Sequence, residues 1–451
     1  MSPGRDFVRF ACLALMLIVA GCSDPASPTS AAVAAPLAGK APPASAPTVT
    51  STLPSEANRD TTLDVQITGS GFDSGSRASF ERDGVADPRV RVNTTRFVKS
   101  TSIVANVTIA ADAVTDFYDV AVVTGSGKKG IGTELFAVEV RASALVGGDR
   151  VTAVNSRGEA VGWGPRSAAC DNLSTPMFWR ADGTPVALPL GTFCGGTPNA
   201  INASGVILGA LFGGAPNANG LWTPTGSGYA LEEIAPAPDG YRPITSGLND
   251  QGEIIGWGQG SARLYWWSSS TGWLPMQVPA GATTCLVRSA INNLGVIAGM
   301  CSIAGQAYDG YYWQDHNATP VLLPRPSGAG DVWVRDMNDA GVIVGYLYGS
   351  RTTAVKWTPT GSGYAVSFLP DLGVKSAAYA IAQDGTVSGS VNRTVNTNRP
   401  ALWSPSGQLI LLGLNKNGDT GEAPTVAVTP TGIVAGGSLT SSGSTLWKTA
   451  P

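Results

Sequence analysis

The chain has 451 residues, a net charge of −3, 57 glycines, 31 prolines and a single histidine. The charge balance leaves no basic surplus for binding nucleic acid, and one histidine excludes most histidine-dependent catalysis and most zinc sites. Many glycines in a chain that is 43% hydrophobic indicate many tight turns between short strands. We therefore expect an all-β protein of two to three domains.

Residues 1–21 are expected to form an export signal. Arg5 and Arg9 precede an apolar run at residues 10–20, which is too short to span a bilayer. The run ends in small residues directly before Cys22, and this pattern resembles the lipobox of bacterial lipoproteins. The resemblance implies cleavage before Cys22, acylation of that residue and a lipid anchor in a membrane, with an outer-membrane or cell-surface location. An ordinary signal peptide followed by a chance cysteine is the alternative.

Residues 22–47 are rich in Pro, Ala and Ser and carry almost no charge. They lack the large apolar side chains that a core requires, so we expect an extended, disordered tether. An alanine-rich helix is the alternative, and the scattered prolines weaken it.

Residues 48–141 are expected to form a β-sandwich. Alternating segments at residues 63–68, 102–108 and 118–123 are separated by clusters of Gly, Asp and Ser. Close spacing of such short segments is typical of two packed antiparallel sheets.

Parts of this region resemble the IPT/TIG family of immunoglobulin-like domains. The resemblance rests on QITGSGF at residues 66–72, FAVEV at residues 136–140, and the opening segment from Pro47 to Pro54. It implies an Ig-like domain that acts as a spacer or a binding module, and we expect a spacer. Glycines at the corner allow the chain to turn, and Phe72 is predicted to plug the sandwich.

Residues 142–451 contain a repeat whose period is typical of propeller blades. Five of the seven units place an Asn at a predicted turn, and all seven have a Gly three residues after that position and a second Gly four residues later. Successive turns are 47, 47, 43, 46, 44 and 47 residues apart, so we expect a β-propeller of roughly seven blades. The last two units lose the Asn but keep both glycines, which indicates a backbone requirement for glycine and an optional local hydrogen bond for the Asn. The turn positions are Asn155, Asn202, Asn249, Asn292, Asn338, Ala382 and Thr429.

A tryptophan follows each second glycine by 10 to 17 residues. We expect these large, flat side chains to pack between neighbouring blades, with sugar stacking as the alternative. The tryptophans are Trp179, Trp222, Trp266 or Trp267, Trp313, Trp357, Trp403 and Trp447.

The last unit lacks a fourth strand of its own, because only four residues follow Trp447. Residues 142–148 resemble the fourth strands of the other units and belong to no unit. We predict that they complete the last blade and close the ring by strand exchange, which removes an exposed sheet edge. The units, with residues 292–299 matching closely, resemble the HAF repeats of exported bacterial proteins. That resemblance implies a propeller-like exported protein and no particular activity.

Four cysteines lie outside the signal, namely Cys170, Cys194, Cys285 and Cys301. An even number in an exported chain suggests disulfides. In a four-stranded blade, the loops expected to hold these residues lie on one face, and this geometry favours the pairs Cys170–Cys194 and Cys285–Cys301. A metal site is the alternative, but no histidine lies nearby, and we expect neither a metal nor a cofactor.

The same face is predicted to collect aromatic side chains that could stack on sugars or meet a protein partner. Their alternative role is to cap the ends of strands. This candidate ligand face comprises Trp163, Trp257, Met300, Trp333, Tyr346 and Tyr348.

No recognisable catalytic constellation is present in the sequence. Turn preference explains acidic residues such as Asp250, and no spacing forces two carboxylates together. We expect a surface-anchored, non-catalytic binding or scaffold lipoprotein whose partner is a glycan or an envelope protein. The alternative is a polysaccharide-active enzyme, a hydrolase or lyase, that uses carboxylates in the propeller pocket. Convergence of acidic residues with Arg288 or Arg335 around a deep pocket would favour the enzyme.

Overall fold

The computed structural model describes residues 45–145, 148–167, 173–214, 216–393 and 398–412, and the strands at 425–428, 433–437 and 444–448. It divides into two compact units, Met1–Ser45 and Ala46–Pro451. The predicted signal peptide, Cys22 and nearly all of the tether lie outside the described residues. The described part of the chain is built from strands and has no helix that could cross a membrane.

Two sheets of the second unit pack face to face around one apolar core. Phe72 is 4% exposed within this core, as the sequence predicted, and Gly71 next to it has a φ of +73°. A Cβ at Gly69 would lie 1.9 Å from the Thr48 carbonyl oxygen, so the corner requires glycine there. The first sheet is ordered β1 (Thr48–Leu53), β3 (Thr61–Ser70), β7 (Ser102–Ile109) and β6 (Val90–Lys99). The second is ordered β2 (Glu56–Asn58), β9 (Lys129–Glu139), β8 (Phe117–Val123), β4 (Arg77–Arg82) and β5 (Val85–Ala86).

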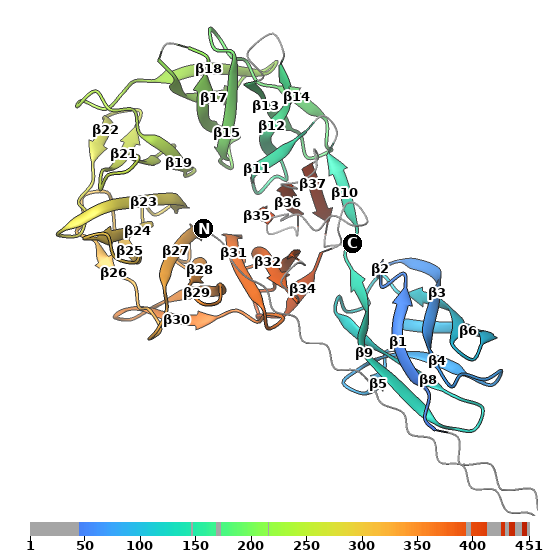
Figure 1. Cartoon of the computed structure of the whole chain (residues 1–451). Coiled ribbons are helices and arrows are strands. Elements are labelled where there is room, and N and C mark those ends of the chain that lie inside the picture. The colour runs from blue at the N-terminus through green and yellow to red at the C-terminus, as the bar shows by residue number, and fades with distance from the viewer. Residues whose placement is uncertain are drawn as a thin grey trace, which may run out of the picture. The chain divides into compact units, whose positions relative to one another are not determined.

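Seven four-stranded antiparallel sheets follow one another around a ring (Figure 1). Six of them consist of consecutive strands, and we number these blades one to six in chain order. Blade one is β11 (Arg150–Val154), β12 (Ala160–Ser167), β13 (Leu173–Trp179) and β14 (Pro185–Ala187); blade two is β15 (Gly195–Ile201), β16 (Ile207–Phe212), β17 (Ala218–Pro224) and β18 (Tyr229–Ile234); blade three is β19 (Ile244–Leu248), β20 (Ile254–Trp257), β21 (Leu264–Ser268) and β22 (Gly272–Pro275). Blade four is β23 (Ala282–Ile291), β24 (Ile297–Ile303), β25 (Asp309–Trp313) and β26 (Val321–Leu322); blade five is β27 (Asp331–Met337), β28 (Ile343–Tyr348), β29 (Thr353–Thr360) and β30 (Gly363–Phe368); blade six is β31 (Lys375–Ile381), β32 (Val387–Asn392), β33 (Asn398–Trp403) and β34 (Leu409–Leu411).

The seventh sheet joins strands from opposite ends of the repeat region. It is ordered β10 (Ala142–Leu145), β37 (Ser444–Lys448), β36 (Ile433–Gly437) and β35 (Thr425–Val428). β10 pairs antiparallel with β37, with Ala142 opposite Trp447 and Leu145 opposite Ser444. The segment before the first turn therefore lies as the fourth strand of this sheet.

The first glycine of each described repeat occupies a tight turn. In blade three the Gly252 amide donates to the Asn249 carbonyl at 3.1 Å, and Gly252 has a φ of +80°. The equivalent glycines of the other five described turns have φ values from +74° to +91°. Only glycine adopts this backbone region at no steric cost, which explains why it persists in every unit. The seventh turn lies outside the described residues.

The second glycine is required by close packing, because the backbone of the paired strand approaches it directly. A Cβ at Gly162 or at Gly345 would lie 1.9 Å from a carbonyl oxygen of the paired inner strand. At Gly389 the corresponding distance is 2.1 Å. Real Cβ atoms do not approach oxygen this closely, so alanine would displace the backbone at these positions.

The repeat tryptophans pack between neighbouring blades, as predicted. Five of them are 0% exposed, and Trp222 packs in one cluster with Val161 and Phe178 of the preceding blade. The Trp222 indole N–H donates at 2.7 Å to the Pro189 carbonyl in the segment that connects the two blades. The same bond recurs from Trp313 to Gln277, from Trp357 to Pro324 and from Trp403 to Pro370.

Blade three makes this contact differently from the expectation. Trp267 pairs with Ile254, which is the position expected for the repeat tryptophan. The indole that donates to the segment connecting blades two and three is instead that of Trp273 on β22, at 3.0 Å from the Ala235 carbonyl oxygen. Trp273 is 3% exposed. A tryptophan on the fourth strand therefore makes this hydrogen bond, while Trp266 and Trp267 pack in clusters shared with neighbouring blades, as predicted.

The sandwich and blade six share a polar and apolar interface. Arg399 of β33 forms ion pairs with Glu139 of β9 and with Glu56 of β2. Arg393 pairs with Glu134 and lies 4.4 Å from the centre of the Phe117 ring. Phe117 also packs against the apolar core of this blade. These contacts make residues 46–451 one compact unit.

Candidate functional site

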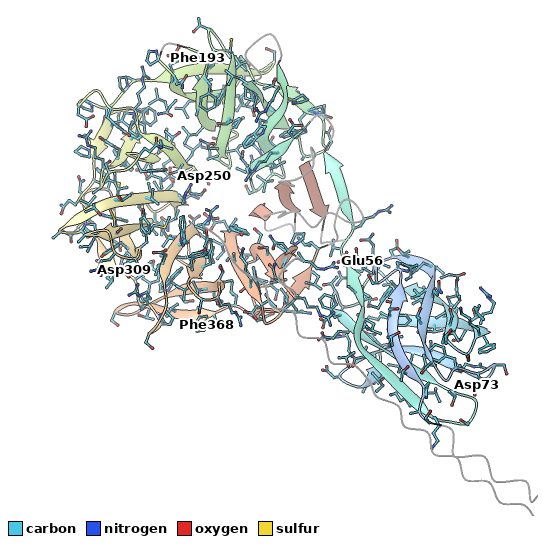
Figure 2. The ribbon with its side chains drawn as sticks, viewed as in Figure 1. Glu56, Asp73, Phe193, Asp250, Asp309 and Phe368 are labelled. Carbon is cyan, nitrogen blue, oxygen red and sulfur yellow. A yellow bond between two sulfur atoms is a disulfide. The ribbon has the colours of Figure 1, made fainter. Side chains whose placement is uncertain are left out.

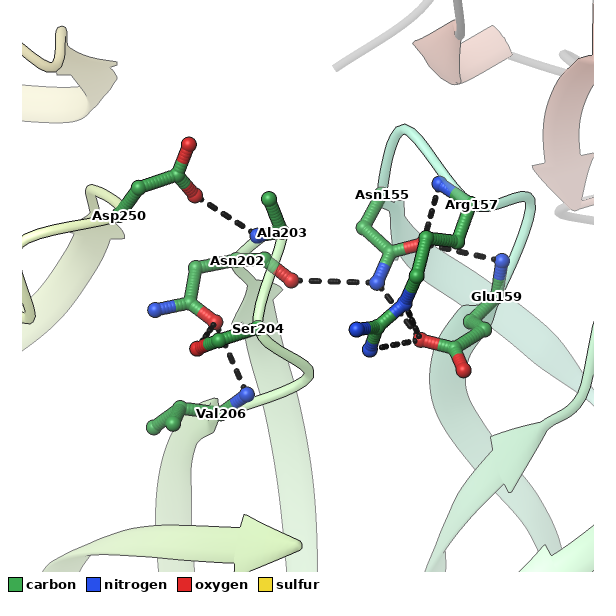
Figure 3. A network of polar contacts seen from close by, with 8 residues as sticks. All are labelled: Asn155, Arg157, Glu159, Asn202, Ala203, Ser204, Val206 and Asp250. Carbon is green, nitrogen blue, oxygen red and sulfur yellow. Dashed lines mark hydrogen bonds and ion pairs between the residues drawn. The ribbon is translucent and has the colours of Figure 1, made fainter.

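The repeat asparagines form a chain of hydrogen bonds from blade to blade. Within its own turn, the Asn249 side-chain oxygen accepts from the Glu253 amide at 2.9 Å. Its side-chain nitrogen also crosses to the next blade and donates to the Asn292 carbonyl at 3.1 Å. Figure 3 shows the equivalent link from Asn155 to Asn202, at 3.1 Å. The expectation of a merely local role was incomplete, because each side chain satisfies its own turn and the neighbouring blade together.

The links run continuously from blade one to blade six. Donation from side chain to carbonyl runs Asn155 to Asn202, Asn202 to Asn249, Asn249 to Asn292, Asn292 to Asn338, and Asn338 to Ala382. The backbone carbonyl of Ala382 accepts this bond, and a carbonyl is available whatever the side chain is. Blade six therefore keeps its link to blade five without an Asn, although the alanine side chain cannot donate to the next blade.

A second set of links uses the residue after each asparagine. The Asp250 carboxylate accepts from the Ala203 amide at 2.7 Å (Figure 3), and the Asp250 amide donates to the Asn293 side chain at 2.8 Å. Figure 2 places Asp250 on the inner side of the ring. Asn293 continues the chain to Asp339, which donates to Gln383. The turn aspartates thus link neighbouring blades, whereas the sequence predicted a role within the turn alone.

These turns surround an axial cavity of about 290 Å³. Its wall combines the turn asparagines with deeper residues that include Thr152, Asn199, Asp336 and Tyr379. The sequence predicted that function lies on the opposite, cysteine-bearing face, whereas this cavity opens among the turns. Thr152, Asn199 and Tyr379 sit at β-bulges of the inner strands, where one extra residue turns its side chain toward the axis.

Asp336 is the acidic group held deepest in this wall. Its carboxylate accepts from the Met337 amide and, across the blade boundary, from the Ile381 amide, both at 2.9 Å. Removal from water raises its pKa to about 7, although these hydrogen bonds and the charge of Arg335 act in the opposite direction. A carboxyl group that titrates near neutrality in a cavity is a candidate for proton transfer.

The raised pKa predicts how Asp336 affects stability. The folded carboxyl group binds its proton more tightly than the unfolded one, so stability falls as pH rises from about 4 to about 7, and the full penalty remains above pH 7. Asp336→Asn carries no charge and keeps an oxygen for only one of the two amides, because the Met337 and Ile381 amides donate to different carboxylate oxygens. The lost hydrogen bond acts at every pH, so we expect the free energy of unfolding of the variant, relative to the parent, to rise by about 2–4 kcal/mol from pH 4 to pH 8, measured by urea denaturation. Asp384→Asn, at an exposed turn of blade six, is the control and should leave the pH profile unchanged. An equal effect of Asp336→Asn at both pH values would contradict the assignment.

Three arginines on the innermost strands of blades one, four and five each lie against an aromatic ring. The guanidinium carbon of Arg150 lies 5.5 Å from the Trp163 ring centre, that of Arg288 lies 5.9 Å from Trp257, and that of Arg335 lies 5.4 Å from Tyr379. Burial lowers the pKa of Arg150 and of Arg288, and the positive charge of Arg335 lowers each pKa further. The charges from blades one, four and five therefore act on one another.

The predicted aromatic face is partly assembled. Trp333 and Tyr346 stack with ring centres 5.9 Å apart and an interplanar angle of 9°. The Tyr308 ring centre lies 6.0 Å from that of Trp333, and the Tyr379 ring centre lies 6.1 Å from that of Tyr346. We call Tyr308, Trp333, Tyr346 and Tyr379 the aromatic arc. It links blades four, five and six.

Other members of the predicted face lie elsewhere. Trp163 and Trp257 are half-buried under their arginines, and Tyr348 is 56% exposed at the end of β28. Met300 is 0% exposed, so it belongs to the core of blade four and is removed from the candidate face. Tyr308 and Tyr379 were not among the residues predicted for this face.

Cys285 and Cys301 form the predicted disulfide. Both residues lie on paired strands, opposite each other on β23 and β24, with Cα atoms 4.1 Å apart. The expected loop position of Cys301 was wrong, because β24 continues to Ile303. The bond therefore joins two strands of one blade. Cys194 lies directly before β15, and its predicted partner Cys170 lies outside the described residues.

His316 does not join the axial site. It stacks on Trp266 with ring centres 3.9 Å apart, and its side chain bonds to that of Asn317. Within the described residues, no group of three or more His, Cys, Asp and Glu side chains is arranged to hold a metal ion.

The ring of four-stranded sheets around an axis defines the chain as an all-β protein of the β-propeller type. No family model and no curated protein matches it. Several solved structures do. Virginiamycin B lyase from Staphylococcus aureus is 14% identical with a TM-score of 0.46, and the match covers 68% of this chain and 99% of the lyase.

Two further solved structures show similar levels of agreement. YCF48 from Cyanidioschyzon merolae is 10% identical with a TM-score of 0.44, over 68% of this chain and 98% of that one. An auxiliary nutrient binding protein from Bacteroides ovatus is 11% identical with a TM-score of 0.35, over 90% and 98% respectively. At these identities the similarities concern the fold alone, and no activity is carried over.

Proposed function

We propose that the protein is an exported lipoprotein that presents a binding propeller outside the cell. In this proposal Cys22 carries the lipid anchor, residues 22–47 form the tether, and an Ig-like sandwich of the IPT/TIG type supports a seven-bladed propeller of HAF-type repeats that β10 closes. The sequence patterns support the anchor and the family assignments. Labelled palmitate that still enters a Cys22→Ser variant would contradict the anchor.

The binding role rests chiefly on the aromatic arc. Its four rings come from three blades and make consecutive contacts, and all four side chains are half-buried. Aromatic faces that are held rigidly and remain partly accessible bind ligands at low entropic cost. We therefore favour a non-catalytic binding module whose ligand is a glycan.

A specific observation supports a second candidate, a polysaccharide-active hydrolase or lyase. Asp336, with a pKa near 7, lies beside Arg335 in the wall of the axial cavity. A carboxyl group in this protonation range can donate or accept a proton during cleavage of a glycan. An enzyme was expected to bring several acidic residues together with Arg288 or Arg335 around a deep pocket. Asp336 beside Arg335 supplies one such acidic residue.

The experiment that separates the two candidates uses the same polysaccharides twice. The full chain is first applied to a glycan array, and each polysaccharide that it binds is then incubated with the protein and analysed for new reducing ends and unsaturated products. Binding without turnover is the expected result. Product formation that disappears in Asp336→Asn would replace the binding module with the enzyme, and absence of binding across the array would overturn the glycan-binding role.

A further inference from the structure

The axial arginines carry positive charge that nearby protein groups do not neutralise. Among the described residues, Arg150, Arg288 and Arg335 form no ion pair, although most other ion pairs of the chain use arginine. The Nε atoms of Arg288 and Arg335 are buried and have no hydrogen-bond acceptor in the described structure. Asp336 is the adjacent acid, but its two oxygens accept from backbone amides and not from Arg335.

Such an arrangement is unfavourable for the free protein. Arg150 and Arg288 are partly buried cations that the charge of Arg335 repels, which opposes folding, and a buried N–H without an acceptor costs further free energy. The cost is offset when an anion binds the guanidinium groups. Aromatic rings under all three arginines limit their movement, so the donors are held in place before a ligand arrives.

We propose that this cluster binds the carboxylate of a uronic-acid-containing glycan. A guanidinium group offers two parallel N–H donors, whose spacing matches the two oxygens of a carboxylate. The interaction between such a fork and an anion is stronger where water is partly excluded, as it is for Arg288.

The aromatic arc explains why the anion is expected on a sugar. Tyr379 contacts Arg335 through its ring face and contacts Tyr346 of the arc at 6.1 Å. A ligand that binds both features carries an oxyanion next to a ring with an apolar face, and a uronic acid residue has this combination. This inference rests on the proposed glycan-binding function and specifies the class of glycan.

The test compares two oligosaccharides that differ only in charge. Full-length protein is titrated by calorimetry with hexagalacturonate and with the same oligomer after its carboxyl groups have been reduced to alcohols. We expect the acidic oligomer to bind at least tenfold more tightly, and its affinity to fall as salt rises. In Arg335→Gln the affinity for the acidic oligomer should fall at least tenfold, while the affinity for the reduced oligomer stays unchanged.

Arg263→Gln is the matched control. Arg263 also lies over an aromatic ring, 5.5 Å from the Tyr241 centre, but it is paired with Asp239, and its side chain is 56% exposed. Its substitution removes the same charge and should leave both affinities unchanged. If Arg335→Gln does not fold, Arg335→Lys keeps the charge without the fork, and an intermediate affinity is then expected.

The outcomes distinguish this inference from the function on which it rests. Equal affinity for the two oligomers would overturn the anion site and leave glycan binding intact. Selective binding of dextran sulfate over both dextran and hexagalacturonate would replace the carboxylate with a sulfate. A rise in melting temperature with inorganic sulfate, without binding of any oligosaccharide on the array, would overturn both the uronate assignment and the proposed glycan-binding function.

Discussion

Two double substitutions in β10 should have opposite consequences for the ring. In a strand at the edge of a sheet, alternate backbone N–H groups point toward the neighbouring strand and toward solvent. β10 is an edge strand whose neighbour is β37. Ser143→Pro/Leu145→Pro and Ala142→Pro/Ala144→Pro therefore remove N–H groups from opposite edges of the strand.

We expect one of these variants to lose stability sharply and the other to resemble the parent. The damaging pair removes two hydrogen bonds to β37 and leaves carbonyl groups unsatisfied, at a cost of about 2–6 kcal/mol. It also weakens the contact that holds the last sheet in the ring. Proline is tolerated where the N–H faces solvent, so the other pair is an internal control with the same residue type and number. Thermal unfolding followed by circular dichroism measures the difference, and parental melting of both variants would contradict closure through β10.

The repeat and its packing could be predicted because they depend on local rules. Gly252 has positive φ because of the turn geometry, and Trp222 is buried because flat blades leave room for a large ring between them. Each requirement recurs in every blade, so the residues that meet it recur at a regular spacing in the sequence. The role of residues 142–148 could be predicted as well, because they resemble a fourth strand and belong to no repeat unit.

The axial site could be predicted only in part, because bulges decide which side chains face the axis. Arg335 and Tyr379 occupy such bulges in blades five and six. A bulge adds one residue and reverses the alternation of the strand, and no residue type marks it reliably in one sequence. Asp336 looked like an ordinary acid near a turn for the same reason. Its raised pKa comes from burial against the neighbouring blade, which the sequence does not reveal.

The contact between the sandwich and blade six was also invisible in the sequence, since Arg399 lies 260 residues from Glu139. The Arg399 side chain is 15% exposed and that of Glu139 is 5% exposed. The sandwich was expected to act as a separate spacer. The ion pair between Arg399 and Glu139 instead links the sandwich to the repeat region, and both of its side chains are largely shielded from solvent.

Arg399→Ala should consequently be among the most damaging single substitutions in the chain. It leaves the Glu139 carboxylate buried without a cation, and removing one partner of a buried pair costs about 3–5 kcal/mol. Replacing Arg399 and Glu139 together, as in Arg399→Met/Glu139→Gln, removes the more deeply buried of the two unpaired carboxylates and should recover most of the loss, because the remaining partner Glu56 is 25% exposed. Urea denaturation of the three proteins measures these differences as shifts of the unfolding midpoint.

Arg89→Ala provides the matched control for the loss of an arginine. Arg89 pairs with Asp112 at 2.9 Å, but their side chains are 50% and 73% exposed. Solvent screens this pair, so its removal should leave the unfolding midpoint close to that of the parent. If Arg399→Ala shifts the midpoint no further than Arg89→Ala, the interface does not depend on the buried pair. Limited proteolysis near residue 141 then distinguishes a loosened interface from an intact one, because cleavage there requires the backbone around Val140 to leave its contact with Leu412.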